Sequence, residues 1–509
     1  MELSSILWSL FSMLIPMLLS SLIRQKKSNP PSPLPPGPKS LPFVGCIFQM
    51  LRNRPTFEWM HKIMHEMNTE IACFRLGGIH VIPVTSPEIA REFLKKQDSI
   101  FSSRPVCMSA ELRSSKYLSA VLSPSGNQQK KMKKIVISSV LSPAKHRWLH
   151  GKRIKEADHL VNYILNQCNN SLTGGEVNIR IAARHYCRNV TRRMFFDKRF
   201  FGRGTEDGGP GTEEVEHVEA LFTILDHLFA FSLSDYVPWM RSFDMDGHEK
   251  ILSMAVGSVR KHQDPEIDRR IEMWKNGLKK EEEDLLDVLI MLRDGTGRPL
   301  LTTEEIKAQI MELMLAAVDN PSNAIEWVLA EMLNQPELLQ KATQELDTVV
   351  GRDRLVQEFD LPRLKYIKAC IKEAFRLHPI SPFNVPHVST QDTIVGGYFI
   401  PKGSHVLLSR LGLGRNPRIW EDPLKFKPER HLEDLDELKV DLNNQELHLL
   451  SFGIGRRGCP GVQLGSTMSI MLLARLLHSF TWEIPRGLSR IDLTESPLFA
   501  IAKPRLAIL

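Results

Sequence analysis

Residues 451–461 read SFGIGRRGCPG and form the most informative stretch of the 509-residue chain. They match the pattern F-x-x-G-x-R-x-C-x-G at every fixed position, which are Phe452, Gly455, Arg457, Cys459 and Gly461. This order and spacing is typical of a loop wrapped around a large planar ligand. We therefore predict that Cys459 is a metal ligand, that Phe452 packs on the planar group and that Arg457 neutralises an anionic substituent. Gly455 and Gly461 would allow the loop to approach the group closely.

The same loop also satisfies a dinucleotide-binding pattern, G-x-G-x-x-G, at residues 453–458. Glu483 follows at the end of FTWEI, where that fold would need an acidic residue. However, the chain ends at residue 509, which leaves too little sequence for the further strands and helices of such a sheet. The better interpretation is a haem iron bound by the Cys459 thiolate, because such a ligand favours O–O cleavage.

Two further motifs accompany the cysteine loop. Glu373 and Arg376 lie in KEAFRLHP at one face of a predicted helix, and Arg430 lies in KPERH before the loop. With these motifs the chain resembles the cytochrome P450 superfamily from its N-terminus to its last residues. The resemblance implies a mainly α fold with small β-sheets, and a structural triad of Glu373, Arg376 and Arg430 behind the haem. It also implies haem b with Cys459 as axial ligand, O2 as co-substrate, and electrons from NADPH through NADPH-cytochrome P450 reductase.

The N-terminus predicts a membrane anchor. Residues 5–23 are uncharged and long enough to span a bilayer, and Arg24, Lys26 and Lys27 follow at once. A cleaved signal peptide would carry its basic residues before the apolar run. We expect an anchor at 1–23, a basic and proline-rich hinge at 24–40, and one haem-thiolate monooxygenase domain at 41–509. The positive-inside rule then places the catalytic domain in the cytosol, on the endoplasmic reticulum membrane.

Composition limits the other classes of function. The apolar share of 42% supports a large core, and the formal net charge of +7 is spread over the chain. A spread excess of this size does not indicate nucleic-acid binding, whereas it suits an acidic protein partner or anionic membrane lipid. The seven cysteines are scattered without a C-x-x-C pair, which argues against a disulfide framework or a zinc ribbon.

The pattern of apolar residues predicts mostly helices. The longest helix is expected at about 303–333, started by the sequence TTEE, and Pro321 inside it is expected to kink or open it. Short strand pairs are expected around Gly77-Gly78 and Gly396-Gly397, where alternating runs flank turn glycines.

AAVDNPSNA, residues 316–324, resembles the oxygen-binding segment of the P450 superfamily. By this resemblance Asp319 is a candidate catalytic residue that relays protons toward bound O2. Asn320 stands where a threonine usually follows, and an amide cannot relay protons as a hydroxyl does, so water or the substrate must complete the relay. Asn320, Ser322 and Asn323 could either hydrogen-bond the substrate or cap carbonyls freed by Pro321.

The Asp-Asn-Pro-Ser sequence also narrows the resemblance. Together with FNVPHVS (383–389), SHVLLSRLGLGRNP (404–417), PERH and the terminal AKPRL, it resembles the plant amino-acid N-monooxygenases, closest to the branch acting on aliphatic or phenylalanine-type substrates. Such enzymes hydroxylate the nitrogen of an L-amino acid twice and convert it to the aldoxime in defence metabolism. The alternatives are a carbon-hydroxylating or peroxide-rearranging P450, or a haem-poor member without catalysis.

Further haem contacts follow from the resemblance. Arg104 in FSSRP and His387 in VPHVS are expected to bind haem propionates, although either could bind the carboxylate of the substrate instead. The family usually has Trp-x-x-x-Arg on a helix that contacts a propionate, whereas this chain has Gln129 and Lys133. Lysine keeps the charge without the bidentate fork of arginine. We therefore expect Lys133 to bind the haem and retention of the haem to be weaker than usual.

Overall fold

The computed structural model describes residues 32–169, 174–432, 442 and 447–508. The predicted anchor at 1–23 and the first part of the hinge lie outside these residues. Within the described part of the chain, no helix is both long and apolar enough to cross a bilayer. The second part of the predicted hinge rests on the folded domain, because Pro33 O accepts a hydrogen bond from Phe399 N at 2.8 Å and Pro36 O accepts one from Cys73 N at 2.8 Å.

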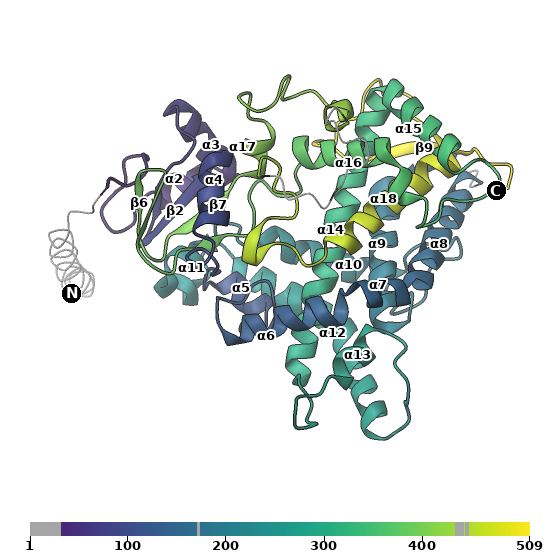
Figure 1. The fold of residues 1–509 in the computed structure, drawn as a ribbon, viewed down its shortest axis with the longest axis horizontal. Coiled ribbons are helices and arrows are strands. Elements are labelled where there is room, and N and C mark those ends of the chain that lie inside the picture. Colours follow the sequence, from purple (N-terminus) through teal and green to yellow (C-terminus); the bar gives the residue numbers. More distant parts are fainter. Residues whose placement is uncertain (1–31, 170–173, 433–441, 443–446, 509) are drawn as a thin grey trace, which may run out of the picture.

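Helices make up most of the molecule, as predicted (Figure 1). The longest is α14, Thr303–Asn334, and it begins where the sequence indicated, because Thr302 and Glu305 form a reciprocal capping box. The helix runs continuously through Pro321. The other α-helices are α2 Ile47–Arg52, α3 Thr56–Glu66, α4 Pro87–Arg91, α5 Met108–Arg113, α6 Asn127–Ile135, α7 Pro143–Trp148, α8 His150–Cys168, α9 Ile179–Phe196, α10 Thr212–His227, α11 Leu233–Tyr236, α12 His248–Lys275, α13 Leu285–Met291, α15 Pro336–Val349, α16 Lys365–Leu377, α17 Arg410–Gly414 and α18 Val462–Ser479.

In the part of the chain that the structure describes, three small sheets complete the fold, and both predicted strand pairs are confirmed. Strands β1 Phe74–Leu76 and β2 Ile79–Val84 pair antiparallel around Gly77-Gly78, and β5 Thr393–Val395 pairs with β6 Tyr398–Ile400 around Gly396-Gly397. The largest sheet has the order β1-β2-β7-β4, with β7 His405–Leu408 and β4 His387–Val388. A further sheet joins β3 Glu176–Asn178, β9 Phe499–Pro504 and β8 Phe480–Glu483.

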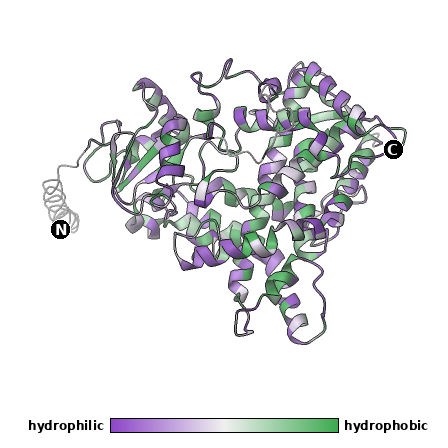
Figure 2. Cartoon of the chain, in the orientation of Figure 1, coloured by the Kyte–Doolittle hydropathy of each residue, from purple (hydrophilic) through white to green (hydrophobic). Residues whose placement is uncertain are grey.

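The main hydrophobic core lies among the central helices. Buried side chains from α8, α9, α14, α16 and α18 form its largest cluster, and smaller clusters pack beneath the sheet of β1, β2, β4 and β7. Figure 2 shows that many helices carry a hydrophobic and a hydrophilic face, as expected for helices that cover one another. Helix α14 packs against α18, which follows the segment that contains Cys459.

Candidate active site

Cys459 lies three residues before α18, in a loop that its own backbone closes. The amide of Cys459 donates to Phe452 O at 2.8 Å, and the amide of Gly461 donates to Cys459 Sγ at 3.3 Å. Burial raises the pKa of the Cys459 thiol, while the Gly461 amide, Arg410 and Lys133 act in the opposite direction. The N-terminus of α18 adds a partial positive charge at the same place. The loop therefore fixes the position of the sulfur atom, and a metal cation bound there would displace its proton and stabilise the thiolate.

Gly455 in this loop packs closely against another segment of the protein. Gly455 has a φ of +75°, and an added Cβ would lie 2.8 Å from both Leu94 O and Asp98 Oδ1. The Asp98 carboxylate accepts hydrogen bonds from the amide of Arg456 at 3.1 and 3.2 Å. Gly455 thus allows the loop to sit on the segment 94–98.

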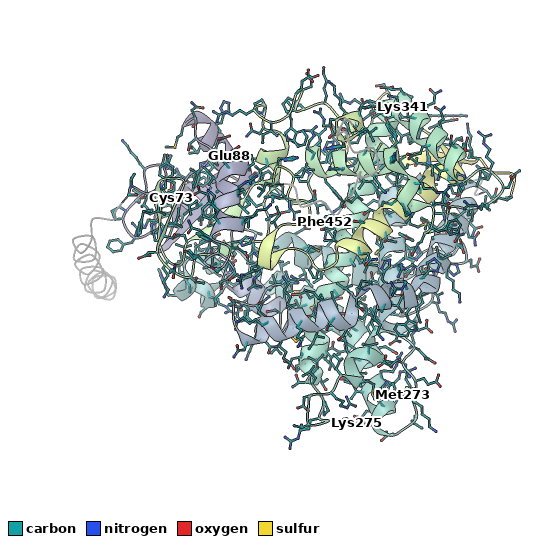
Figure 3. The ribbon with its side chains drawn as sticks, viewed as in Figure 1. Cys73, Glu88, Met273, Lys275, Lys341 and Phe452 are labelled. Atoms are coloured by element: carbon teal, nitrogen blue, oxygen red, sulfur yellow. The ribbon has the colours of Figure 1, made fainter. Side chains whose placement is uncertain are left out.

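Phe452 lies at the start of the loop, half-buried and near the middle of the molecule (Figure 3). Its ring makes an edge-to-face contact with Phe375 of α16, with ring centroids 5.8 Å apart. It also packs against the main core. The ring is therefore fixed next to the cysteine, as a residue that packs on a planar group must be.

A few residues near the centre of the molecule are accessible to solvent. Ala316 and Asn320 are exposed although most of α14 around them is buried, and Cys459 is exposed although protein atoms surround it closely enough to raise its pKa. Arg410 interacts electrostatically with both Cys459 and Asp319. Cys459, Arg410 and the middle of α14 are therefore close to one another, and the region between the cysteine loop and α14 is called the internal space. A planar group bound through Cys459 would lie in this region.

Three cations gather beside this space. Arg104 donates to Val385 O at 2.8 Å and Pro386 O at 2.9 Å, and Arg457 donates to Ser102 O at 2.5 Å and Ser123 O at 2.8 Å. Lys133 Nζ donates to Arg456 O. Burial, together with repulsion from Arg457, lowers the pKa of Arg104 to about 9, and burial lowers the pKa of Arg457 to about 10.

The charges of Arg104, Arg457 and Lys133 are only partly balanced by the protein, because Glu312 acts electrostatically on the two arginines and Asp98 on the lysine. Burial lowers the pKa of Lys133, and so does repulsion from Arg457 and Arg104. In the described part of the chain, no carboxylate forms an ion pair with any of the three. An isolated group of buried cations is costly unless an anion joins it. Their arrangement fits the two propionates of a haem, with Lys133 at the position where the resemblance puts an arginine.

His387 contributes differently from the prediction. Its Nδ1 lies 2.8 Å from Phe101 O, and because a carbonyl can only accept, the ring proton is on Nδ1. Burial, followed by repulsion from Arg104, lowers the pKa of His387 to about 3. In this neutral state Nε2 is an acceptor. His387 therefore requires a second proton before it can donate to a propionate, and it adds no charge to the group of three cations.

Glu312, which was not predicted from the sequence, binds the loop at 119–122 beside the three cations. Its carboxylate on α14 accepts from Ser119 Oγ at 2.6 Å and from the amides of Ala120, Val121 and Leu122 at 3.0, 3.0 and 3.4 Å. The carbonyl of Val121 in turn accepts from Arg104 and Arg457, each at 3.4 Å. The only available signal was one glutamate within the apolar run IMELML. Glu312 thus holds the loop that orients two of the cations.

We expect Glu312→Gln to weaken haem binding. The amide of glutamine presents a donor to a loop that offers only donors, and hydrogen bonds to a charged acceptor contribute about 1.5–3 kcal/mol each. The purified variant should have a lower ratio of haem to protein and a lower thermal unfolding temperature. Glu304→Gln, an exposed position in the first turn of the same helix, is the matched control. Equal haem content in wild type and Glu312→Gln would contradict this role.

Side chains around Pro321 separate the two roles considered for the polar residues there. Asn320 Nδ2 donates to Ala316 O at 2.9 Å, and Ser322 Oγ donates to Val318 O at 2.7 Å, so both side chains cap carbonyls of their own helix. Asn323 Nδ2 instead donates to Asp319 Oδ1 at 2.5 Å. Burial raises the pKa of Asp319 to about 6. The side chains of Asn320 and Ser322 thus bond within their own helix, although not to Ala317 O, the carbonyl that Pro321 leaves free, and Asn323 orients the carboxyl of Asp319.

The residues of the predicted triad lie together, away from the internal space. Arg376 Nε and Nη2 each donate to the Glu373 carboxylate at 2.8 Å, and Arg430 Nε donates to it at 3.1 Å. His431, which sequence analysis did not single out, lies 2.9 Å from Glu373 Oε2 through its Nε2. Burial raises the pKa of Glu373, but Arg376 and His431 outweigh it and hold this pKa at about 2. The group is a buried ionic network with no access to a ligand.

Comparison with known families identifies the fold and the chemistry together. The family described as "Cytochrome P450" matches residues 35–509. This chain is a cytochrome P450. Its cofactor is therefore haem iron, and it uses O2 with electrons from NADPH, as expected from the cysteine loop.

Proteins of known activity that are similar to this P450 include amino-acid N-monooxygenases. It is 53% identical to a tryptophan N-monooxygenase of Prunus mume, over 99% of this chain and 95% of that protein. It is 56% identical to an isoleucine N-monooxygenase of Lotus japonicus, over 93% of this chain and 90% of that protein. A zebrafish cytochrome P450, solved with abiraterone, superposes with a TM-score of 0.70 at 23% identity, over 89% of this chain and 100% of that chain. The last similarity supports the fold.

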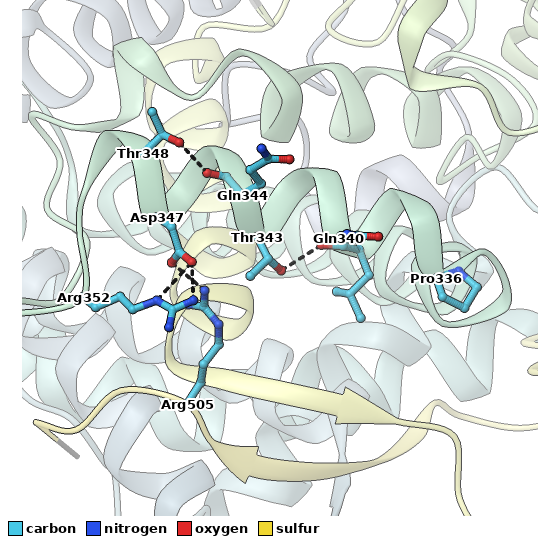
Figure 4. Close-up of a pocket in the computed structure, with 9 residues that line it drawn as sticks. Pro336, Gln340, Thr343, Gln344, Asp347, Thr348, Arg352 and Arg505 are labelled. Atoms are coloured by element: carbon cyan, nitrogen blue, oxygen red, sulfur yellow. Dashed lines mark hydrogen bonds and ion pairs between the residues drawn. The ribbon is translucent and has the colours of Figure 1, made fainter.

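A surface pocket elsewhere on the P450 carries no comparable chemistry. Its volume is about 650 Å³, and it lies along α15 beside Arg505 (Figure 4). Asp347 in this pocket pairs with Arg352 at 2.7 Å and with Arg505 at 2.5 Å, so each charged residue that lines the pocket has a partner within the protein. None of its lining residues belongs to the cysteine loop or to α14.

Proposed function

We propose that this cytochrome P450 is an L-amino-acid N-monooxygenase that forms the aldoxime of its substrate. The observation that carries the proposal is the identity of more than half of all positions, over nearly the whole chain, to proteins named as N-monooxygenases of single amino acids. Two N-hydroxylations, a dehydration and a decarboxylation make up the reaction. In total the amino acid consumes two O2, two NADPH and two protons, and it yields the aldoxime, CO2, three waters and two NADP⁺.

The proposed roles within the site follow its geometry. Haem bound through a thiolate supplies O2 activation, because that ligand favours O–O cleavage. Cys459 would hold the iron through its thiolate, and Arg104, Arg457 and Lys133 would hold the propionates. Asp319 can take up and release a proton near neutral pH, since its pKa is raised to about 6 by burial. Asn323 fixes one oxygen of that carboxyl, so the proton resides on the other oxygen, Oδ2.

Electrons must reach the haem from outside the chain. The side of the cysteine loop presents exposed basic residues, Lys130 and Lys134 on α6 and Arg456 in the loop itself. Such a surface is complementary to an acidic partner. We assign it to the docking of NADPH-cytochrome P450 reductase.

The proposed location is the endoplasmic reticulum membrane, with a single-pass anchor at 1–23 and a cytosolic catalytic domain. Support comes from the apolar run at 5–23 and the basic residues directly after it. The proline-rich segment then carries the chain to the domain, which it meets at Pro33 and Pro36. Anchor and reductase would thus share one membrane surface.

The candidate substrates are valine, isoleucine, leucine, phenylalanine and tryptophan. The relatives compared above are named for tryptophan and for isoleucine, two very different shapes. The test uses membranes that contain the P450 and its reductase, incubated with NADPH and each of these L-amino acids. We expect at least one aldoxime, detected by mass spectrometry and absent without NADPH. No aldoxime from any of them would refute the proposal, and turnover of a peroxide without NADPH would favour the peroxide-rearranging alternative.

A further inference from the structure

Arg410 borders the internal space and was not predicted from the sequence. It is the first residue of α17, directly after β7 and Ser409, whose hydroxyl caps the helix by accepting from the Gly412 amide at 2.7 Å. Arg410 Nε donates to Oδ1 of the buried Asn384. The backbone amide of Asn384 donates to Leu408 O at 2.9 Å. The segment that contains Asn384 and the strand that precedes Arg410 are therefore joined through their backbones. The guanidinium is therefore held at a fixed place.

The charge of Arg410 lacks a partner in the protein. Burial lowers the pKa of Arg410 to about 10. Among the residues that the structure describes, no carboxylate forms an ion pair with it, and its two terminal amino groups donate no hydrogen bond. By contrast, the buried Arg376 uses all its nitrogens on Glu373 and on backbone carbonyls. Arg410 thus offers the two parallel donors that bind a carboxylate.

The position of Arg410 distinguishes it from the cations assigned to the propionates. Arg104, Arg457 and Lys133 affect one another electrostatically. The charged groups that act on Arg410 are instead Cys459 and Asp319, which stand on opposite sides of the internal space. A ligand held by Arg410 would therefore lie between the cysteine loop and the middle of α14, where the reaction takes place.

We propose that Arg410, held by Asn384, binds the α-carboxylate of the amino-acid substrate. This inference rests on the proposed function and names the group that recognises the part common to all amino acids. A bidentate contact to the carboxylate fixes the α-carbon, and the amino nitrogen is one bond away from that carbon. Arg410 would therefore position the nitrogen for hydroxylation without selecting the side chain. An amine without the carboxylate would lose this contact.

The test compares ligands with and without the carboxylate. L-phenylalanine, L-isoleucine and L-tryptophan are titrated into the haem-loaded P450 against phenethylamine, 2-methylbutylamine and tryptamine, and binding is followed through the shift of the haem absorption band. The amino acid that the wild type converts should bind about 10- to 100-fold more weakly to Arg410→Gln. Binding of the matching amine should stay within about twofold of wild type. Arg410→Lys should recover part of the loss.

Controls separate this role from folding and from the proposed function. Arg418→Gln removes an exposed arginine of the following segment, whose partner Glu70 lies 3.1 Å away, and should bind the amino acid as the wild type does. Unchanged amino-acid binding in Arg410→Gln would overturn the inference. Loss of the carbon-monoxide band in both Arg410 variants would assign Arg410 to haem binding and overturn it as well. If the wild type converts no amino acid, the proposed function itself fails.

Discussion

Cys459→Ser is expected to abolish both the thiolate spectrum and all turnover. A hydroxyl does not ionise near neutral pH, so the hydrogen bond from the Gly461 amide and the N-terminus of α18 would have no anion to stabilise. The reduced variant with carbon monoxide should lack the absorption band typical of a thiolate ligand. Aldoxime formation should fall to the level measured without NADPH, because O–O cleavage depends on the electron density that the thiolate donates.

The matched control for this experiment is Cys168→Ser. Cys168 ends α8 and is half-buried, and its thiol is free. This variant should keep the band and the activity of the wild type. A thiolate band that survives in Cys459→Ser, or that disappears in Cys168→Ser alone, would contradict the assignment of the ligand.

Glu373→Gln is expected to give the largest loss of stability. The substitution removes the negative charge that Arg376, Arg430 and His431 share, and it leaves two guanidinium groups in the protein interior without their counter-ion. Breaking a buried ion pair from one side costs about 3–5 kcal/mol, a large part of the total of about 5–15 kcal/mol for a folded domain. Denaturant unfolding should show the loss, and little folded protein should be recovered at 37 °C.

The same carboxylate predicts how stability depends on pH. Its pKa is about 2 in the folded protein, against an ordinary value of 4.5. A depressed pKa contributes stability that is fully present above the ordinary value and is lost as the pH falls toward 2. Between about pH 4.5 and 2 the wild type should therefore lose stability more steeply than Glu373→Gln. Glu337→Gln, an exposed position on α15, should follow the wild-type curve, and equal slopes for Glu373→Gln and wild type would contradict the role of Glu373.

Local patterns were sufficient for a large part of the fold and the site. The cysteine loop, the helix containing Pro321 and the strand pairs around Gly77-Gly78 and Gly396-Gly397 each depend on residues that are close in sequence. Spacing alone therefore predicts them. The ionic network around Glu373 could be anticipated because KEAFRLHP and KPERH are motifs, although the contribution of His431 depends on how the second motif turns.

Other parts of the site depend on contacts between distant segments, which no local pattern reveals. Glu312 meets the loop at 119–122, about 190 residues earlier, and Arg410 meets Asn384 across paired segments. A single glutamate in an apolar run, or a single arginine after a strand, has many possible partners. The tautomer of His387 could not be predicted from the sequence either, because the position of its ring proton depends on the nearby carbonyl of Phe101.

The contacts of Pro33 and Pro36 bear on how a shortened form of the enzyme should be designed. Phe399 and Cys73 each donate a backbone amide to this segment, and Gly37 lies so close to the carbonyl of Cys73 that an added Cβ would be 2.0 Å from its oxygen. The proline-rich stretch is thus an edge of the folded unit as well as a linker. A soluble version for crystallisation should begin before Pro33, since a cut at residue 40 would strip two amides of their acceptors and uncover the sheet beneath them.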